Sequence, residues 1–237
     1  MSKRIAIVQS SYIPWKGYFD LIASVDEFVL YDDAQYTKRD WRNRNRVKTA
    51  NGLLWLTVPV EVKGRFNQRV RDAVVADPRA IERHWRTIQT SYARAACFRE
   101  YESRLESLFC QASSDRLSAV NFQMLSGLCR LLHIQTPITW SMDYRHAGNP
   151  TQHLLDICDQ AAATTYLSGP SARSYLDVGM FRDAGIAVEF MDYTGYPEYS
   201  QLYPPFEHTV SVIDLLMHTG CEAPRYMLHA TRRAATS

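Results

Sequence analysis

The sequence predicts an α/β fold with a mostly parallel sheet, flanking helices and a helical segment in mid-chain. Two short, continuous apolar runs near the N-terminus, 5–8 and 28–31, are typical of strands buried on both faces. Between about 77 and 133, apolar residues recur every three or four positions, which is the period of an amphipathic helix. Strand-like runs then return. This order favours a single α/β domain over residues 1–237.

The N-terminal elements form a strand–helix–strand unit. The run 5–8 reads Ile-Ala-Ile-Val, a loop follows, and residues 18–25 are expected to form a short helix before the second strand at 28–31. Two strands joined in this way lie parallel in one sheet. A third strand is expected at 53–60, after the turn signal Asn51-Gly52. The basic residues before this turn could flank a hairpin or connect two strands.

The middle of the chain is expected to be helical. Asp77 followed by Pro78 marks a helix start, because an acidic N-cap precedes proline at the first helical position. One face of this helix is formed by Ile81, Trp85, Ile88 and Tyr92. Two further amphipathic helices are expected at 101–112 and 115–133.

The α/β alternation continues in the C-terminal half. Short strands are expected at 138–141, 165–167 and 186–190. Helices are expected at 151–163 with Thr151 as its cap, after the turn at 168–171, and at 210–217.

Composition narrows the class of protein. The 237 residues carry a net charge of +2, with 46% hydrophobic and 22% charged residues, which is an ordinary globular balance that does not call for nucleic acid. No run approaches the ~20 apolar residues of a membrane span. The N-terminal apolar run is too short for a signal-peptide core, and the five cysteines form no CxxC pair. We therefore expect a cytoplasmic protein without a membrane partner.

The densest cluster of functional side chains lies at 38–48. Six Lys or Arg fall within these eleven residues. The aromatic and amide residues interleaved with them or just before them are Tyr36, Trp41, Asn43 and Asn45. Because the planar donor fork of arginine suits phosphate and carboxylate, the cluster predicts a binding site for a small anionic ligand. A solvated charged loop is the competing interpretation.

The alternation within this cluster predicts two faces. If the segment is extended, its side chains point alternately to opposite sides. The arginines Arg42, Arg44 and Arg46 would then share one side, and Asn43 and Asn45 the other. A nucleotide, phosphate or sulfate is expected along the arginine row.

Two adjacent acids are the first candidates for catalytic residues. Asp32 and Asp33 follow the second strand, where either could act as a base, orient a sugar hydroxyl or help to hold Mg²⁺. An ion pair with a neighbouring arginine is the competing interpretation. Lys38 and His208 complete the candidate set. Mg²⁺ is the one candidate cofactor, because no histidine or cysteine spacing typical of a metal site occurs.

Two loops are expected to form the remaining walls of a site, because ligands of open α/β sheets bind at the carboxyl ends of the strands. The loop after the first strand offers Gln9, Tyr12, Trp15 and Tyr18. The turn after the strand 165–167 offers Ser168, Gly169 and Ser171 at an expected helix start, where free N–H groups suit an anion. An ordinary capped turn is the alternative there.

Several segments carry a family resemblance. They read Tyr-Ile-Pro-Trp-Lys-Gly-Tyr-Phe at 12–19, Tyr-Asp-Asp-Ala-Gln-Tyr at 31–36, Trp-Leu-Thr-Val-Pro-Val at 55–60 and Ser-Val-Ile-Asp-Leu-Leu at 211–216. In these segments the chain resembles the WbqC-like family of bacterial proteins, over nearly its full length. Ser10 departs from the pattern, since the family usually has proline there.

The resemblance implies a role in bacterial surface-polysaccharide (O-antigen) or secondary-metabolite assembly. It points to a transferase that moves an acyl or aminoacyl group to an amine of a nucleotide-linked sugar or a similar acceptor. An acyl or aminoacyl carrier protein is a candidate partner. Two alternatives stay open: a nucleotidylyltransferase-like enzyme that uses Mg²⁺ at the two acids, and a non-catalytic protein that binds a nucleotide sugar.

Overall fold

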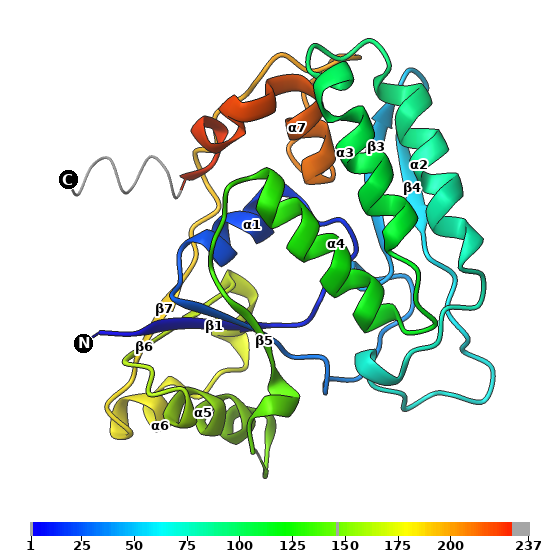
Figure 1. The fold of residues 1–237 in the computed structure, drawn as a ribbon. Helices are drawn as coiled ribbons and strands as arrows, with labels where there is room; N and C mark the ends of the chain where they lie inside the picture. The colour runs from blue at the N-terminus through cyan, green and yellow to red at the C-terminus, as the bar shows by residue number, and fades with distance from the viewer. Residues whose placement is uncertain (1, 146, 229–237) are drawn as a thin grey trace.

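The structure, a computed structural model, describes residues 2–145 and 147–228. Its centre is a five-stranded, all-parallel sheet with the strand order β5-β2-β1-β6-β7 (Figure 1). The strands are β1 (Arg4–Val8), β2 (Glu27–Leu30), β5 (Ile138–Trp140), β6 (Thr165–Ser168) and β7 (Ala187–Phe190). The predicted α/β class and the shared sheet of the runs 5–8, 28–31 and 165–167 are therefore confirmed.

Helices cover both faces of the sheet (Figure 1). One face carries α1 (Lys16–Ala23), α4 (Leu117–Leu131) and α7 (Val212–Thr219), and the other carries α5 (Pro150–Gln160) and α6 (Val178–Asp183). Side chains alternate across β1 accordingly: Ala6 belongs to the core under α1 and α4, whereas Ile5 and Ile7 belong to the core under α5 and α6. Burial on both faces explains why β1 is a continuous apolar run.

The helical segment in mid-chain is confirmed as α2 (Arg79–Tyr92), α3 (Phe98–Gln111) and α4. The predicted inner face of α2 is buried at Ile81, Trp85, Ile88 and Tyr92. The Asp77 carboxylate accepts a hydrogen bond from the Arg79 backbone N–H at 3.1 Å at the start of α2, although Pro78, and not Asp77, occupies the N-cap position. No helix in the described part of the chain is long and apolar enough to cross a membrane.

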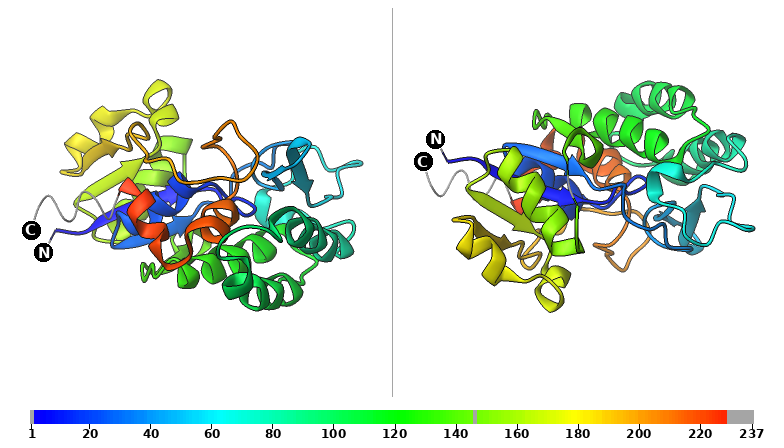
Figure 2. Two further views of the ribbon diagram at one scale, coloured as in Figure 1. Left: turned by 90° about the horizontal axis from the view of Figure 1, so that it is seen from above. Right: turned by 90° about the horizontal axis from the view of Figure 1, so that it is seen from below.

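The basic cluster supplies a strand of its own. β3 (Arg44–Thr49) pairs with β4 (Gly52–Thr57) in an antiparallel hairpin separate from the main sheet. Gly52, with φ +98°, takes the backbone conformation that the turn requires. Val47, opposite Leu54, and Leu56, opposite Asn45, lie on the same face of the hairpin and are buried, and α2 packs against β3. Figure 2 shows the hairpin at the end of the molecule remote from the N-terminus.

Two local expectations were wrong. The single helix expected after the turn at 168–171 is instead a five-residue 3₁₀ turn, Pro170–Ser174, followed by α6. α6 starts separately because the Asp177 carboxylate accepts hydrogen bonds from the first backbone N–H groups of that helix. α5 is capped by Asn149, not by Thr151: Asn149 accepts from the Gln152 N–H at 2.9 Å, and Pro150 takes the first helical position.

A buried histidine links the helical segment to the loop after β1. The Tyr12 hydroxyl and His84 Nδ1 lie 2.9 Å apart, and both residues are buried. Burial lowers the pKa of His84 from 6.5 to about 4, and a hydrogen bond to the Thr57 backbone opposes this only weakly. The imidazole therefore stays neutral in the folded protein at neutral pH.

The lowered pKa of His84 predicts acid sensitivity. Below pH 6.5 the unfolded chain binds a proton at this ring that the folded protein binds only near pH 4, so stability falls as the pH drops through this window. We expect this term to lower the free energy of unfolding by about 2 kcal/mol between pH 7 and pH 5. Urea denaturation of the wild type and of His84→Gln at both pH values measures it, and an equal pH dependence in the two proteins would contradict it.

Candidate functional site

A cavity lies where the sheet reverses its strand order. β2 and β5 lie on one side of β1, and β6 and β7 on the other, so the switch falls between β1 and β6. Open α/β sheets bind ligands at the carboxyl ends of their strands beside such a point. A cavity of about 580 Å³ is found there, with Gln9, just after β1, and Ser168, at the end of β6, in its wall.

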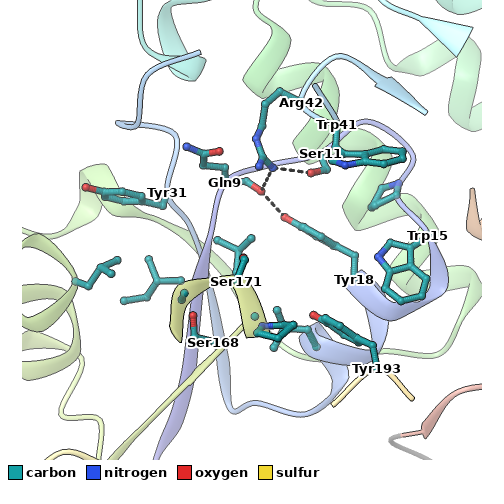
Figure 3. Close-up of a pocket in the computed structure, with 18 of the residues that line it drawn as sticks. Gln9, Ser11, Trp15, Tyr18, Tyr31, Trp41, Arg42, Ser168, Ser171 and Tyr193 are labelled. Carbon is teal, nitrogen blue, oxygen red and sulfur yellow. Dashed lines mark hydrogen bonds between the residues drawn. The ribbon is translucent and has the colours of Figure 1, made fainter. Parts of the chain in front are cut away.

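Seven aromatic side chains contribute to the wall. They are Trp15, Tyr18, Tyr31, Trp41, Tyr166, Tyr175 and Tyr193. Figure 3 shows Trp15 and Tyr193 at one end of the cavity and Tyr31 at the other, with Ser168 and Ser171 on the side opposite Arg42. Rings with hydroxyl groups at their edges offer both stacking surface and hydrogen bonds. Such a wall suits a ligand that contains flat or sugar-like rings.

Arg42 is the one residue with a formal charge among the described residues that line this cavity. Its Nη1 donates to Ser11 Oγ at 2.9 Å and to the Gln9 carbonyl oxygen at 3.4 Å (Figure 3). Its Nε is buried without a hydrogen-bond partner in the described part of the chain, and the nearest carboxylate oxygen, of Asp40, lies 3.9 Å away. Because the Nε atom is inaccessible, the donors left for a ligand are those of Nη2, which makes no hydrogen bond within the described part of the chain.

A buried carboxylate positions the loop after β1, whose Gln9 and Ser11 accept the hydrogen bonds of Arg42. Asp32 is fully buried, and it accepts hydrogen bonds from the Ser10 N–H at 2.8 Å and from the Ser118 hydroxyl. Burial raises the pKa of Asp32, and these two hydrogen bonds oppose the rise. From α4, Asn121 Nδ2 donates to Ser10 Oγ and to the Arg42 carbonyl oxygen, both at 2.9 Å. These bonds hold Arg42 beside the end of β1.

Further hydrogen bonds join the loop after β1 to the segment that leads into β3. The Tyr12 N–H donates to the Trp41 carbonyl oxygen at 3.0 Å, and Asn45 Nδ2 donates to the Tyr12 carbonyl oxygen at 3.3 Å. The Tyr18 hydroxyl donates to the Gln9 carbonyl oxygen at 2.8 Å. The end of β1 and the start of β3 therefore form one rigid side of the cavity.

None of the four candidate catalytic residues lines the cavity. Asp32 lies beneath the loop, as described above. Asp33 is paired with Arg71 at 2.7 Å and accepts a hydrogen bond from the Ser141 hydroxyl at 2.7 Å. The Lys38 ammonium lies 5.5 Å from the centre of the Phe66 ring, and His208 packs against Phe206. The acids, the arginines and the loop after β1 were expected to line one site. Arg42 and residues of that loop, such as Trp15 and Tyr18, do line the cavity, but the two acids do not.

The two acids are also poorly placed for the candidate Mg²⁺. Both Asp32 oxygens accept protein hydrogen bonds, and Asp33 is occupied by an arginine and a serine. The described residues contain no group of three or more His, Cys, Asp or Glu that could hold a metal ion. Mg²⁺ needs exposed oxygen ligands directed at a common point, and this pair does not provide them.

The structure divides the predicted binding residues into two sets. Those that line the cavity are Gln9, Trp15, Tyr18, Arg42, Asn45, Ser168, Gly169 and Ser171. Those outside its wall are Tyr12, Asn43, Arg44 and Arg46. The predicted alternation holds in part: Asn43 and Asn45 are buried, and Arg44 and Arg46 lie on the other face over Trp55. Arg42, expected in the same row as these arginines, lines the cavity instead. The asparagines serve the fold, since Asn43 Nδ2 donates to the Val58 carbonyl oxygen at 2.8 Å.

Sequence reasoning missed other parts of the wall. Tyr31 lies at the carboxyl end of β2, and its hydroxyl is 2.8 Å from His153 Nδ1 in the first turn of α5. Its position directly after a strand was a usable signal. Tyr193 and Thr209 reach the wall from a long segment without regular structure, and no local pattern marks them.

One comparison with known proteins identifies a family. A model described as the WbqC-like protein family matches residues 9–226. An uncharacterized protein of Mycobacterium tuberculosis is 50% identical over 225 residues, covering 95% of this chain and 97% of that protein. No solved structure matches the chain.

The contacts of Asp32 predict a structural effect. Asp32→Ala would leave the Ser10 N–H without its acceptor in a buried site, so we expect the free energy of unfolding to fall by about 1–3 kcal/mol. Urea denaturation measures this. Asp115→Ala, whose parent side chain is 78% exposed, is the control and should change stability little. Equal stability of the Asp32→Ala protein and the wild type would refute the structural role.

Proposed function

Because the chain belongs to the WbqC-like protein family, we propose that it is a biosynthetic group transferase that binds an anionic small molecule in the cavity between β1 and β6. A nucleotide-linked sugar of surface-polysaccharide or secondary-metabolite assembly is the substrate class that fits best. The observation that carries this proposal is the charge of the wall. Arg42 is its one formally charged residue among those described, and the described lining contains no Asp or Glu; the nearest carboxylate oxygen, of Asp40, lies outside the wall at 3.9 Å.

The electrostatics of the wall favour a phosphate near Arg42. The side chain is largely buried, so an anion in contact with it is poorly screened by water. A charge-assisted hydrogen bond of this kind is worth about 1.5–3 kcal/mol. The Ser11 hydroxyl, 2.9 Å from Arg42 Nη1, offers a further polar contact beside it.

The shape and composition of the cavity favour a ring-containing ligand. Its volume of about 580 Å³ falls within the usual range for small-molecule sites. Trp15, Trp41 and Tyr193 supply flat surfaces, and Ser168 and Ser171 supply hydroxyl groups. A sugar ring or a nucleobase could stack on the former and be oriented by the latter.

The proposed reaction is transfer of an acyl or aminoacyl group to an amine of the bound sugar. The amine attacks the acyl carbonyl carbon, a C–N bond forms, the bond to the donor's leaving group breaks, and the amine loses a proton. The paired Tyr31 and His153 are the candidate acceptor of that proton, since Tyr31 lies in the wall and its hydroxyl is 2.8 Å from His153 Nδ1. Burial raises the pKa of Tyr31, with Asp33 adding to the rise, so the phenol stays protonated near pH 7 and the imidazole is the base.

The position of the acids weighs against nucleotidyl transfer at Asp32 and Asp33, because neither lies in the wall. A non-catalytic protein that binds a nucleotide sugar would share the cavity and its arginine. It differs from the proposed enzyme in forming no product.

The role of Arg42 predicts a selective loss of affinity. We expect Arg42→Ala to weaken the binding of nucleotide sugars roughly tenfold or more, since about 1.4 kcal/mol corresponds to a factor of ten. Calorimetry with a panel of nucleotide sugars and the matching free sugars measures it. Arg44→Ala is the matched control: Arg44 lies outside the wall, so affinity should stay within about twofold of the wild type. Equal affinity of the wild type and Arg42→Ala would contradict the proposed anion site.

Formation of a product distinguishes the proposed transferase from the non-catalytic alternative. Mass spectrometry of mixtures that contain a nucleotide-linked amino sugar and acyl or aminoacyl thioesters should show an acylated sugar. His153→Ala should lower kcat at least tenfold while leaving the affinity for the sugar nearly unchanged, because the imidazole would act on a proton and not on the phosphate. Binding without product, over a wide panel of donors, would favour the non-catalytic alternative.

A further inference from the structure

The outer face of the β3–β4 hairpin combines exposed aromatic and cationic side chains. In the hairpin register Arg46 lies opposite Trp55 and Lys48 opposite Leu53, so Arg44, Arg46, Leu53 and Trp55 point to the same side. Trp41 adjoins them, with its ring centre 5.4 Å from that of Trp55. We call these five residues, Trp41, Arg44, Arg46, Leu53 and Trp55, the hairpin face. Trp41, Leu53 and Trp55 are 41%, 40% and 39% exposed, although large apolar side chains are usually buried.

The cations of the hairpin face are held in place. The guanidinium carbons of Arg44 and Arg46 lie 4.1 and 5.4 Å from the centre of a Trp55 ring system. The Nε atoms of both arginines are inaccessible to solvent and have no hydrogen-bond partner in the described part of the chain. Side chains ordered in advance lose less entropy on binding, so this arrangement favours recognition of a partner over simple solvation.

The hairpin face is continuous with the cavity. Trp41 belongs both to the face and to the cavity wall. Arg46 donates a hydrogen bond to the Thr209 hydroxyl, and Thr209 also lines the cavity. A partner seated on this face would therefore stand at the cavity.

The charge of the surrounding segment defines the partner's chemistry. Residues 38–69 carry nine Lys or Arg and two Asp or Glu, which leaves 18 of the 27 basic and 23 of the 25 acidic residues for the rest of the chain. This end of a nearly neutral protein is thus strongly positive. An acidic surface would be attracted to it and oriented by it.

We propose that the hairpin face docks an acidic carrier protein, which delivers the donor group into the cavity on a flexible thiol-terminated arm. This partner rests on the proposed group transfer. The thioester C–S bond of the carrier would break as the C–N bond to the sugar amine forms, and the proton that the amine loses would pass through Tyr31 and His153 to the released thiolate. The docking surface itself stands on the exposed residues and their charge.

A protein fits the hairpin face better than a nucleic acid. Tryptophan and arginine are the residues that most often dominate the binding energy of protein interfaces. Nucleic-acid affinity depends mainly on many phosphate contacts along a track of Lys and Arg. The hairpin face offers two arginines that both pack on Trp55, next to the apolar Leu53.

The test uses a purified bacterial acyl carrier protein, in its holo form, as the acidic probe. Biolayer interferometry should show binding at 50 mM NaCl that weakens several-fold at 300 mM. Arg44→Glu and Trp55→Ala should each weaken binding at least tenfold. Arg86→Glu, which changes an exposed arginine on α2, is the control and should stay within twofold. Thermal unfolding curves check that each variant is folded.

The outcomes separate this proposal from the proposed function. Arg42→Ala should still bind the carrier while losing the nucleotide sugar, so the two sites can fail independently. Absence of carrier binding by the wild type at 50 mM NaCl, or equal binding by Arg44→Glu, overturns the docking proposal. Preferential binding of transfer RNA at the hairpin face, abolished by the same two substitutions, would overturn it in favour of a nucleic-acid partner.

Discussion

The buried carboxylate of Asp32 is the contact on which the geometry of the cavity depends. A carboxylate with no access to solvent is tolerated only when donors surround it, and here the Ser10 N–H and the Ser118 hydroxyl provide them. Those bonds fix the chain just beyond β1 against β2 and α4. Asn121 then joins the same loop to the backbone of Arg42. One buried acid thereby sets the position of the only formally charged side chain among the described wall residues.

A second buried network orders another segment that contributes to the cavity wall. Asp214 on α7 is fully buried and accepts hydrogen bonds from the Tyr92 and Tyr199 hydroxyls and from the Gln201 amide. Lys16 lies nearby, with its ammonium 4.9 Å from the centre of the Tyr196 ring. Burial lowers the pKa of Lys16 to about 8, with Asp20 and Asp214 opposing the shift. Together these contacts order the segment without regular structure that brings Tyr193 and Thr209 to the wall.

The side chains of the basic cluster point to different surfaces. Which surface each one reaches depends on the alternation along the strand and on whether the residue lies inside β3 or before it. Asn43 and Asn45 turn inward and donate to backbone carbonyl groups, so they hold the start of the hairpin in place, and Asn45 also lines the cavity. Arg44 and Arg46 turn outward and pack on Trp55. Arg42 precedes β3 and leaves this alternation, which is why it alone of the three arginines reaches the cavity. Two neighbouring surfaces, one enclosed and one open, thus arise from a single short segment.

The local sequence pattern by itself determined the α/β class, the helical segment in mid-chain and the strand ends at Gln9 and Ser168. This is because burial of one face of a helix or sheet makes apolar residues recur with a fixed period along the sequence. The pattern also determined that Arg44 and Arg46 share one face and Asn43 and Asn45 the other, since a strand alternates its side chains, but it placed Arg42 wrongly on the face of Arg44 and Arg46. Only the tertiary structure decided which polar residues face a ligand. Asp32 and Asp33 are adjacent, yet their partners Ser118, Ser141 and Arg71 come from distant elements. Whether a carboxylate is exposed or enclosed depends on such non-local donors, and neither a residue type nor its spacing contains that information.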